Sequence, residues 1–236
     1  MVGCGGHDAA LTVRLSGAVV PGDLGLRIGD PVCVRSSHVR VGPAVIDART
    51  AVRWMPQGSD LDPDGLGERV AELQAAARHV AWEGSWALAG AVAGALASAR
   101  PADLDEAVRR AVGRGPGLTP AGDDVLVGIL AVLTAPPVAA GCEPAAARLR
   151  AALAPALPAT TEISRALLGQ ASRGHVSRPV WELTSAVLSG RAPSAPTRAD
   201  VLSTVLSTGA TSGGDTCAGL AAACLLLSRS LEGIMA

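Results

Sequence analysis

Apolar and polar residues change their spacing near residue 60 of this 236-residue chain. Before that point, short runs that alternate or are β-branched predict strands at 11–15, 32–35, 38–41 and 44–47, with Pro- and Gly-containing turns between them. After it, apolar residues recur at intervals of three and four, which is typical of helices packed on a core. The pattern predicts the α+β class, with a small N-terminal β-barrel-like sheet followed by a larger all-helical core domain.

We expect this change of spacing to mark a domain boundary. Residues 8–56 are interpreted as a β-rich N-terminal domain, 57–65 as a linker rich in Asp, Pro and Gly, and 66–236 as the helical domain. The pair Pro136-Pro137 is expected to end an apolar run. Besides the helices that follow the motifs below, the pattern predicts helices at 66–79, 82–99, 102–112, 144–153, 181–188 and 200–206.

The most apolar segment, 85–99, is shorter than the ~20 residues that a membrane-spanning helix needs. At the N-terminus, no charged region is followed by an apolar stretch, as a signal peptide would require. We therefore expect a cytoplasmic protein that does not associate with a membrane.

The segment 113–124 is the most distinctive, and it reads Gly-Arg-Gly-Pro-Gly-Leu-Thr-Pro-Ala-Gly-Asp-Asp. Gly, Pro and Thr at this density exclude the interior of a helix or strand, whereas the apolar run behind it predicts a buried helix. Thr119, Asp123 and Asp124 thus come to a helix start. The unpaired N–H groups and partial positive charge of a helix start favour aspartate caps, a bound anion or a metal beside aspartate.

A second segment, 208–216, repeats this arrangement before another apolar run. Four positions are in step, namely Gly117 with Gly209, Thr119 with Thr211, Gly122 with Gly214 and Asp123 with Asp215. Both copies of Gly-x-Thr-x-x-Gly-Asp could be simple N-caps, in which Thr and Asp are common. Caps do not need glycine at fixed offsets, so we interpret the two copies as two halves of one site.

A third candidate helix start carries Thr160, Thr161, Ser164 and Arg165. Capping explains one threonine but not the whole cluster. Three helix starts aimed into one cavity, with Arg165 and Arg114 nearby, would bind a phosphate or a carboxylate. The aspartates beside it would hold Mg²⁺, act as a general base or bind an amide –NH₂.

Composition excludes several kinds of chemistry. The net charge is −1 and no basic patch stands out, so nucleic acid is not an expected partner. The chain has no Lys, which excludes a Schiff base, pyridoxal phosphate attachment and a P-loop lysine. Its 5 Cys are widely spaced and predict neither a disulfide framework nor a zinc site. No Cys–His or Ser–His spacing points to covalent acyl catalysis, so positioning and electrostatic stabilisation are favoured.

The three motifs together resemble the AllH-like family, which includes a subunit of bacterial oxamate carbamoyltransferase. The signature Gly-Leu-Thr-Pro-x-Gly-Asp-Asp is the specific part. Residues 29–32 and 51–56 are similar to the family's β-rich region, which ends in Trp-x-Pro, so the likeness covers most of the chain. The resemblance implies carbamoyl transfer between carbamoyl phosphate and a small amide or amine such as oxamate, in a complex with companion carbamoyltransferase subunits.

The motif positions define the expected site. We assign catalysis to Asp123, Asp124 and Asp215, and we expect no cofactor other than a possible Mg²⁺ and no dedicated metal ligands. In this hypothesis the Gly-loop amides and Arg165 hold phosphate, Asp123 and Asp215 orient the carbamoyl –NH₂ or the acceptor nitrogen, and Asp124 accepts its proton. The expected substrate-binding residues are Gly115, Gly117, Thr119, Gly122, Thr160, Thr161, Ser164, Arg165, Thr211, Ser212, Gly213 and Gly214.

The chain departs from many relatives at Val125 and near Gly213 and Cys217, where an aromatic residue stands in the family. Smaller residues there are expected to widen the pocket and to change the acceptor. Two other functions are open at this point: a non-catalytic subunit that binds the ligand for its partners, and a Mg²⁺-dependent hydrolase that uses the same aspartates. The duplicated aspartates favour the transferase, because an anion sensor has no use for three carboxylates beside the anion.

Overall fold

The computed structural model describes residues 2–3, 13–14, 24–27, 29–49, 60–98, 100–191 and 197–235. It divides into two compact units, Met1–Pro56 and Gln57–Ala236, which we treat one at a time. The described residues are mostly helical, with a small antiparallel sheet near the N-terminus. This confirms the predicted helical core and the small sheet before it.

The N-terminal unit contains a three-stranded antiparallel sheet in the order β3 (Val32–Val34), β4 (His38–Val41) and β5 (Ala44–Asp47). Its register pairs Val39 with both Val34 and Ile46, so one face is apolar, as alternation along the strands requires. A two-stranded parallel pair joins β1 (Val2–Gly3) to β2 (Val13–Arg14). The strand expected at 11–15 is described only at 13–14, residues 51–56 lie outside the described part, and closure into a barrel stays a prediction.

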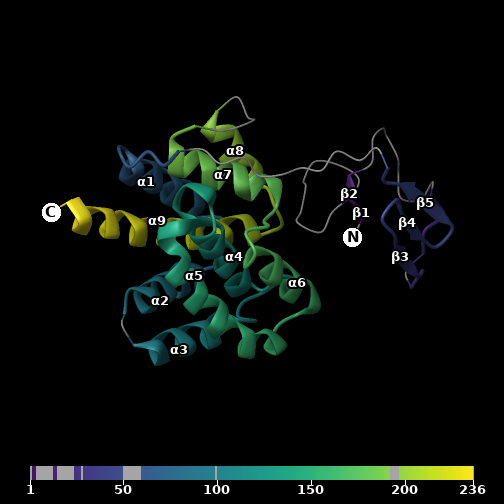
Figure 1. The fold of residues 1–236 in the computed structure, drawn as a ribbon, viewed down its shortest axis with the longest axis horizontal. Coiled ribbons are helices and arrows are strands. Elements are labelled where there is room, and N and C mark those ends of the chain that lie inside the picture. Colours follow the sequence, from purple (N-terminus) through teal and green to yellow (C-terminus); the bar gives the residue numbers. More distant parts are fainter. Residues whose placement is uncertain are drawn as a thin grey trace. The chain divides into compact units, whose positions relative to one another are not determined.

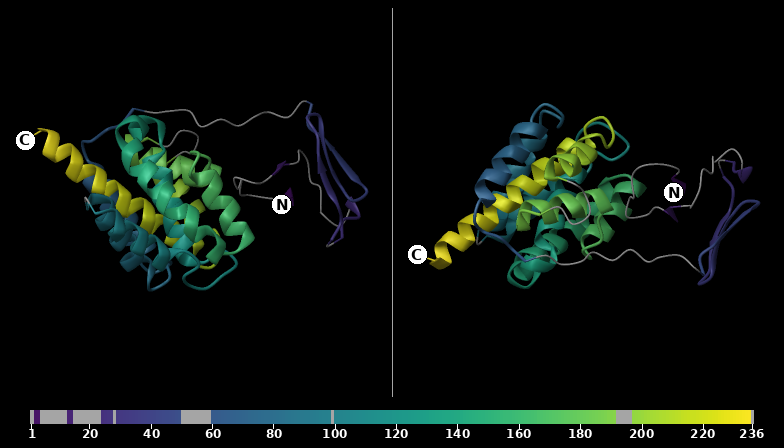
Figure 2. Two further views of the ribbon diagram at one scale, coloured as in Figure 1. Left: turned by 60° about the horizontal axis from the view of Figure 1, so that its bottom comes forward. Right: turned by 90° about the horizontal axis from the view of Figure 1, so that it is seen from above.

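The helical unit carries the motifs, and Figure 1 labels its elements. Their bounds are α1 Leu66–Ala77, α2 Ser85–Ala97, α3 Pro101–Ala111, α4 Ala121–Leu133, α5 Pro136–Ala156, the 3₁₀ turn η2 Leu157–Ala159, α6 Glu162–Ala171, α7 Arg178–Ser189, α8 Arg198–Leu206 and α9 Ser212–Met235. The central helix is α4, which contacts α2, α3, α5, α6, α7 and α9. The long α9, yellow in Figure 2, packs against α1, α2, α4, α7 and α8.

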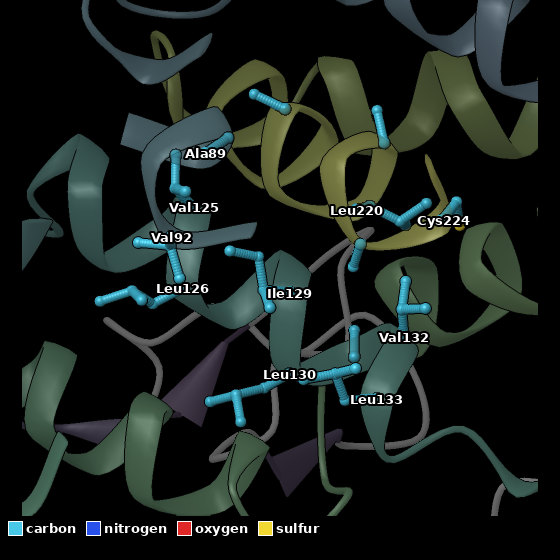
Figure 3. Close-up of a cluster of buried hydrophobic side chains, with 14 of the residues drawn as sticks. Ala89, Val92, Val125, Leu126, Ile129, Leu130, Val132, Leu133, Leu220 and Cys224 are labelled. Carbon is cyan, nitrogen blue, oxygen red and sulfur yellow. The ribbon is translucent and has the colours of Figure 1, made fainter. Parts of the chain in front are cut away.

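The core of this unit is built from small and medium-sized side chains, because the chain has no Phe or Tyr. Val125, Leu126, Ile129 and Leu130 of α4 are fully buried. Figure 3 shows them beside side chains from α2 and α9, namely Ala89, Val92, Leu220 and Cys224. Small side chains let the helices approach closely, so contacts between backbones become part of the packing.

The closest approach is between α4 and α9. A Cβ on Gly128 of α4 would lie 2.1 Å from the carbonyl oxygen of Thr216, and a Cβ on Gly219 of α9 would lie 1.9 Å from that of Val125. The missing side chain of one glycine on each helix therefore leaves room for the backbone of the other helix. Both glycines lie within two turns of their helix start, or about 10 Å along the axis, so this crossing holds the two Gly-Asp motifs in one region.

The expected helix at 144–153 has the wrong start. The pair Pro136-Pro137 does end the preceding apolar run, but α5 begins at the pair itself and continues through Pro144. Proline fits the first turn of a helix, since the N–H groups there have no partner within the helix. Likewise α7 and α8 begin at Arg178 and Arg198, a few residues before the expected starts.

Among the described residues, no single helix is long and apolar enough to cross a membrane, and α2 is one of the shorter apolar helices. The pair formed by Ala121–Leu133 and Pro136–Ala159 meets the test together by length and composition, and it is bent by 119° at the break.

We expect Gly219→Ala to destabilise the helical unit, because the new methyl group would overlap the backbone of α4. The free energy of unfolding should fall by about 1–3 kcal/mol or more, measured by urea denaturation. The matched control is Gly90→Ala at an exposed position of α2, where a Cβ meets nothing within 4 Å. That change should stabilise the chain by about 0.5–1 kcal/mol. Equal effects of the two substitutions would mean that α4 and α9 do not cross here.

Candidate functional site

The first Gly-rich loop connects α3 to α4, and its backbone conformation and close packing require glycine at several positions. Gly113, Gly115 and Gly117 have φ values of 72°, 98° and 103°, a region that other residues rarely adopt. Gly122 has a different constraint, since a Cβ there would lie 2.0 Å from the carbonyl oxygen of Ala111. The start of α4 is thus pressed against the end of α3.

The second loop, before α9, follows the same design. Gly209 has a φ of 64°, which matches the left-handed conformation found in the first loop. A Cβ on Gly213 would lie 2.0 Å from the carbonyl oxygen of Val205, and a Cβ on Gly214 would lie 2.4 Å from the backbone nitrogen of Ala81. Gly122 and Gly214, which are in step in the two copies, therefore both allow a helix start to touch another segment.

The two aspartates in step make equivalent contacts. Asp123 Oδ1 accepts the N–H of Gly113 at 2.9 Å, and its Oδ2 accepts the hydroxyl of Thr160. Asp215 Oδ1 accepts the N–H of Trp82 at 2.8 Å and the hydroxyl of Ser85 at 2.6 Å. Each aspartate thus joins a helix start to a distant segment through one amide and one hydroxyl. Its carboxylate satisfies donors that would otherwise be buried without a partner.

Asp124 has no counterpart in the second copy, where Thr216 stands in its place, and its contacts join the two copies. The hydroxyl of Thr119 lies 3.1 Å from Asp124 Oδ2 and 3.1 Å from the hydroxyl of Ser212. Ser212 also hydrogen-bonds the Asp124 carboxyl group. The N-termini of α4 and α9 therefore meet in one polar cluster of Thr119, Asp124 and Ser212, as expected for two halves of one site.

Burial raises the pKa of Asp124 from its ordinary value to about 8. The hydrogen bonds from Ser212 and Thr119 oppose this rise, and the nearby charges of Asp215 and Asp123 add to it. The carboxyl group is therefore mostly protonated at pH 7 and exchanges its proton close to neutral pH, which suits a general acid or base.

Burial also raises the pKa of Cys217 to about 12, so this thiol stays protonated and is a poor nucleophile.

The third helix start, that of α6, is tied to the first loop. Thr161 caps α6 by accepting the N–H of Ser164 at 3.2 Å, and its hydroxyl donates to the carbonyl oxygen of Leu118 at 3.0 Å. Thr160 donates to Asp123. Ser164 is 1% exposed, and its hydroxyl has no hydrogen-bond partner among the described residues. Hydrogen bonds thus tie Thr160 and Thr161, just before α6, to Asp123 of α4 and to the first loop.

Several predicted phosphate-binding groups have other contacts. Arg165 is 42% exposed at its side chain and lies 4.0 Å from Glu162. The N–H of Gly122 donates to the carbonyl oxygen of Arg114, and the N–H of Gly213 donates to that of Thr208. These two amides are therefore already used within their loops. The role of Arg165 in phosphate binding stays a prediction.

Reasoning from the sequence missed Trp82 and Ser85, which contact Asp215 from more than a hundred residues away. Neither belongs to a motif, and only the fold reveals them. Val125 and Cys217, two places at or near which the resemblance implies an aromatic residue in relatives, are fully buried in the helix packing. The wider pocket expected there stays a prediction. Within the described part of the chain, no group of three His, Cys, Asp or Glu side chains is arranged to hold a metal ion.

We expect Asp124→Asn to change how stability depends on pH. The native state holds the Asp124 proton up to about pH 8, whereas the unfolded chain releases it near pH 4. The native state binds more protons over this interval, so the free energy of unfolding should fall as pH rises and then level off. Asparagine has no such proton, and urea denaturation from pH 4 to about pH 9 should lack this fall. The matched control, Asp105→Asn at an exposed position of α3, should keep the original dependence of stability on pH. Parallel curves for Asp124→Asn and the unmodified chain would refute the raised pKa of Asp124.

Comparison with known proteins gave a match to one family model. Its description is oxamate carbamoyltransferase subunit AllH, and it covers residues 111–224, from the end of α3 into α9. No curated protein and no solved structure matched the chain. The matched segment contains both Gly-Asp loops and the start of α6, while the likeness of residues 29–32 and 51–56 stays a prediction. The resemblance carried by the three motifs is thereby confirmed: residues 111–224 of this chain match the model of the AllH family.

Proposed function

We propose that the chain is a catalytic subunit of a carbamoyltransferase, which transfers a carbamoyl group between carbamoyl phosphate and a small amide or amine such as oxamate. The family name points to a subunit of oxamate carbamoyltransferase, and the word subunit implies companion chains. The observation that supports a catalytic role is the polar cluster of Thr119, Asp124 and Ser212, which joins two helix starts around a buried carboxyl group.

Carbamoyl transfer needs a group that removes a proton from the acceptor nitrogen. That nitrogen attacks the carbamoyl carbon, the bond from this carbon to the phosphate oxygen breaks, and phosphate leaves with the bonding electron pair. The proton passes to the ionised form of Asp124. A carboxyl group with a pKa of about 8 is a far stronger base than an exposed aspartate, yet it is still partly ionised near neutral pH. Thr119 and Ser212 fix its orientation.

Asp123 and Asp215 act on this base from a short distance. Their charges help to raise the pKa of Asp124, and their own oxygens accept hydrogen bonds from four protein groups. We therefore assign them to positioning and to tuning the base. Orientation of the carbamoyl –NH₂ would fall to Asp215 Oδ2, which is buried without a partner among the described residues.

The phosphate is best accommodated at the start of α6. This start contributes the neighbouring Arg165 and the buried hydroxyl of Ser164, which has no partner within the described part of the chain, whereas α4 and α9 begin with buried aspartates. An anion is favoured where a helix start offers N–H groups, and it is disfavoured beside carboxylates. The transferred carbon would then lie between α6 and the cluster around Asp124.

A second candidate is a non-catalytic subunit that binds the ligand for its companions. The bonds of Asp123 and Asp215 favour it, because three of their four carboxylate oxygens already have protein partners. The two functions differ in the effect of Asp124→Asn, which should spare ligand binding in both but abolish turnover only in a catalytic subunit. A Mg²⁺-dependent hydrolase would instead lose activity in EDTA.

We expect carbamoyl phosphate or oxamate at ~100 times its dissociation constant to stabilise the full chain by about 2.7 kcal/mol in thermal unfolding, with or without EDTA.

In the complex with its companion subunits, Asp124→Asn should lower kcat by about 10²- to 10⁴-fold. The control Asp105→Asn makes the same change on the exposed face of α3 and should leave kcat unchanged. Full turnover by Asp124→Asn would exclude Asp124 as the base, and an effect of EDTA would favour the hydrolase.

A further inference from the structure

The indole ring of Trp82 lies close to two glycines, Gly84 and Gly115. A Cβ on Gly84 would lie 2.2 Å from Cζ3 of the ring, and a Cβ on Gly115 would lie 3.3 Å from its Cε3. Both contacts therefore involve the Cε3–Cζ3 edge of the ring. Gly115 belongs to the first Gly-rich loop, so the ring borders the loop that leads to Asp124.

Clearance for the ring explains Gly84 better than backbone conformation does. Gly84 has φ −83° and ψ −13°, which any residue can adopt, so its backbone does not require glycine. A side chain there would overlap the indole ring. The position is thus suited to holding Trp82 in this orientation.

The backbone of Trp82 is fixed by the second copy of the motif. Its N–H donates to Asp215 Oδ1 at 2.8 Å, and the neighbouring Ala81 touches the position of Gly214. Trp82 is therefore in contact with both Gly-Asp loops, through its ring with one and its backbone with the other. The other oxygen of Asp215 is buried without a partner among the described residues, so an acceptor for an N–H donor lies beside this residue.

Trp82 also differs from the other tryptophans. Trp181 is 8% exposed and belongs to the core. Trp86 is also partly exposed, but it packs against the core and its indole nitrogen is buried. Trp54 lies outside the described residues. Trp82 is partly exposed, and the chain has no Phe or Tyr that would provide another aromatic face at the loops.

We propose that Trp82 is a substrate-positioning residue whose indole face forms the wall against which the planar amide or carbamoyl group lies. This inference rests on the proposed function and adds a contact from the segment before α2 to the site. A flat aromatic face restricts a planar group to one orientation, while an N–H of that group donates to Asp215 Oδ2. The placement requires Asp215 to hold the Trp82 backbone, which gives the second Gly-Asp motif a role in substrate orientation.

The test uses two full-length variants that each keep a single tryptophan, Trp82 or Trp86, with phenylalanine at the other three positions. Both are titrated with oxamate and with carbamoyl phosphate while tryptophan emission is recorded. Trp86 is the matched control, because it lies four residues further along the same segment. Calorimetry of Trp82→Phe and Trp82→Ala in the otherwise unmodified chain then gives the affinity, and circular dichroism shows whether each variant is folded.

Emission of Trp82 should change on ligand binding while that of Trp86 does not. Trp82→Phe should retain most of the affinity, and Trp82→Ala should weaken binding by about tenfold. If Trp82→Ala does not fold, the emission data and Trp82→Phe still decide the question. If the unmodified chain binds either ligand but the Trp82 emission stays constant, the inference is wrong and the proposed function stands. If the unmodified chain binds neither ligand, the proposed function fails, and the inference fails with it.

Discussion

Direct contact between the backbones of α4 and α9 is the constraint on which the rest of the helical unit depends. Gly128 and Gly219 each leave room for the carbonyl oxygen of the other helix. A chain without Phe or Tyr fills its core with small side chains, and such a core is dense only if the helices approach this closely. The crossing lies near both helix starts, so the packing that stabilises the fold also brings Thr119 and Ser212 together.

In the duplicated motif, equivalent positions make structural contacts, and the proposed base stands at a position where the two copies differ. Asp123 and Asp215 each accept hydrogen bonds from one backbone amide and one hydroxyl. The repeated sequence therefore forms the same structural contacts in both copies. Asp124 stands outside the repeat, faces two hydroxyls and has its pKa raised to about 8 by burial. The position at which the two copies differ is therefore the one where burial and the neighbouring aspartates raise the pKa, and it is the residue that we propose as the base.

Reasoning from the sequence could locate the helices, the three strands and the two loops, because apolar spacing and glycine placement are local signals. It also predicted that the loops meet, since two copies at helix starts are most simply halves of one site. Three features depended on the fold. The start of α5 was missed because prolines suit a first turn as well as a break. The bonds from Trp82 and Thr160 come from distant segments, and the raised pKa of Asp124 comes from burial.

A double-mutant cycle between Thr119→Val and Ser212→Ala tests the meeting of the two motifs most directly. These hydroxyls lie 3.1 Å apart, although 93 residues separate them in the sequence. If both motifs contribute to one cluster, the effects of the two substitutions on the free energy of unfolding should be coupled by about 0.5–3 kcal/mol. Additive effects would contradict a shared cluster and would leave two independent helix caps, with no common site between them.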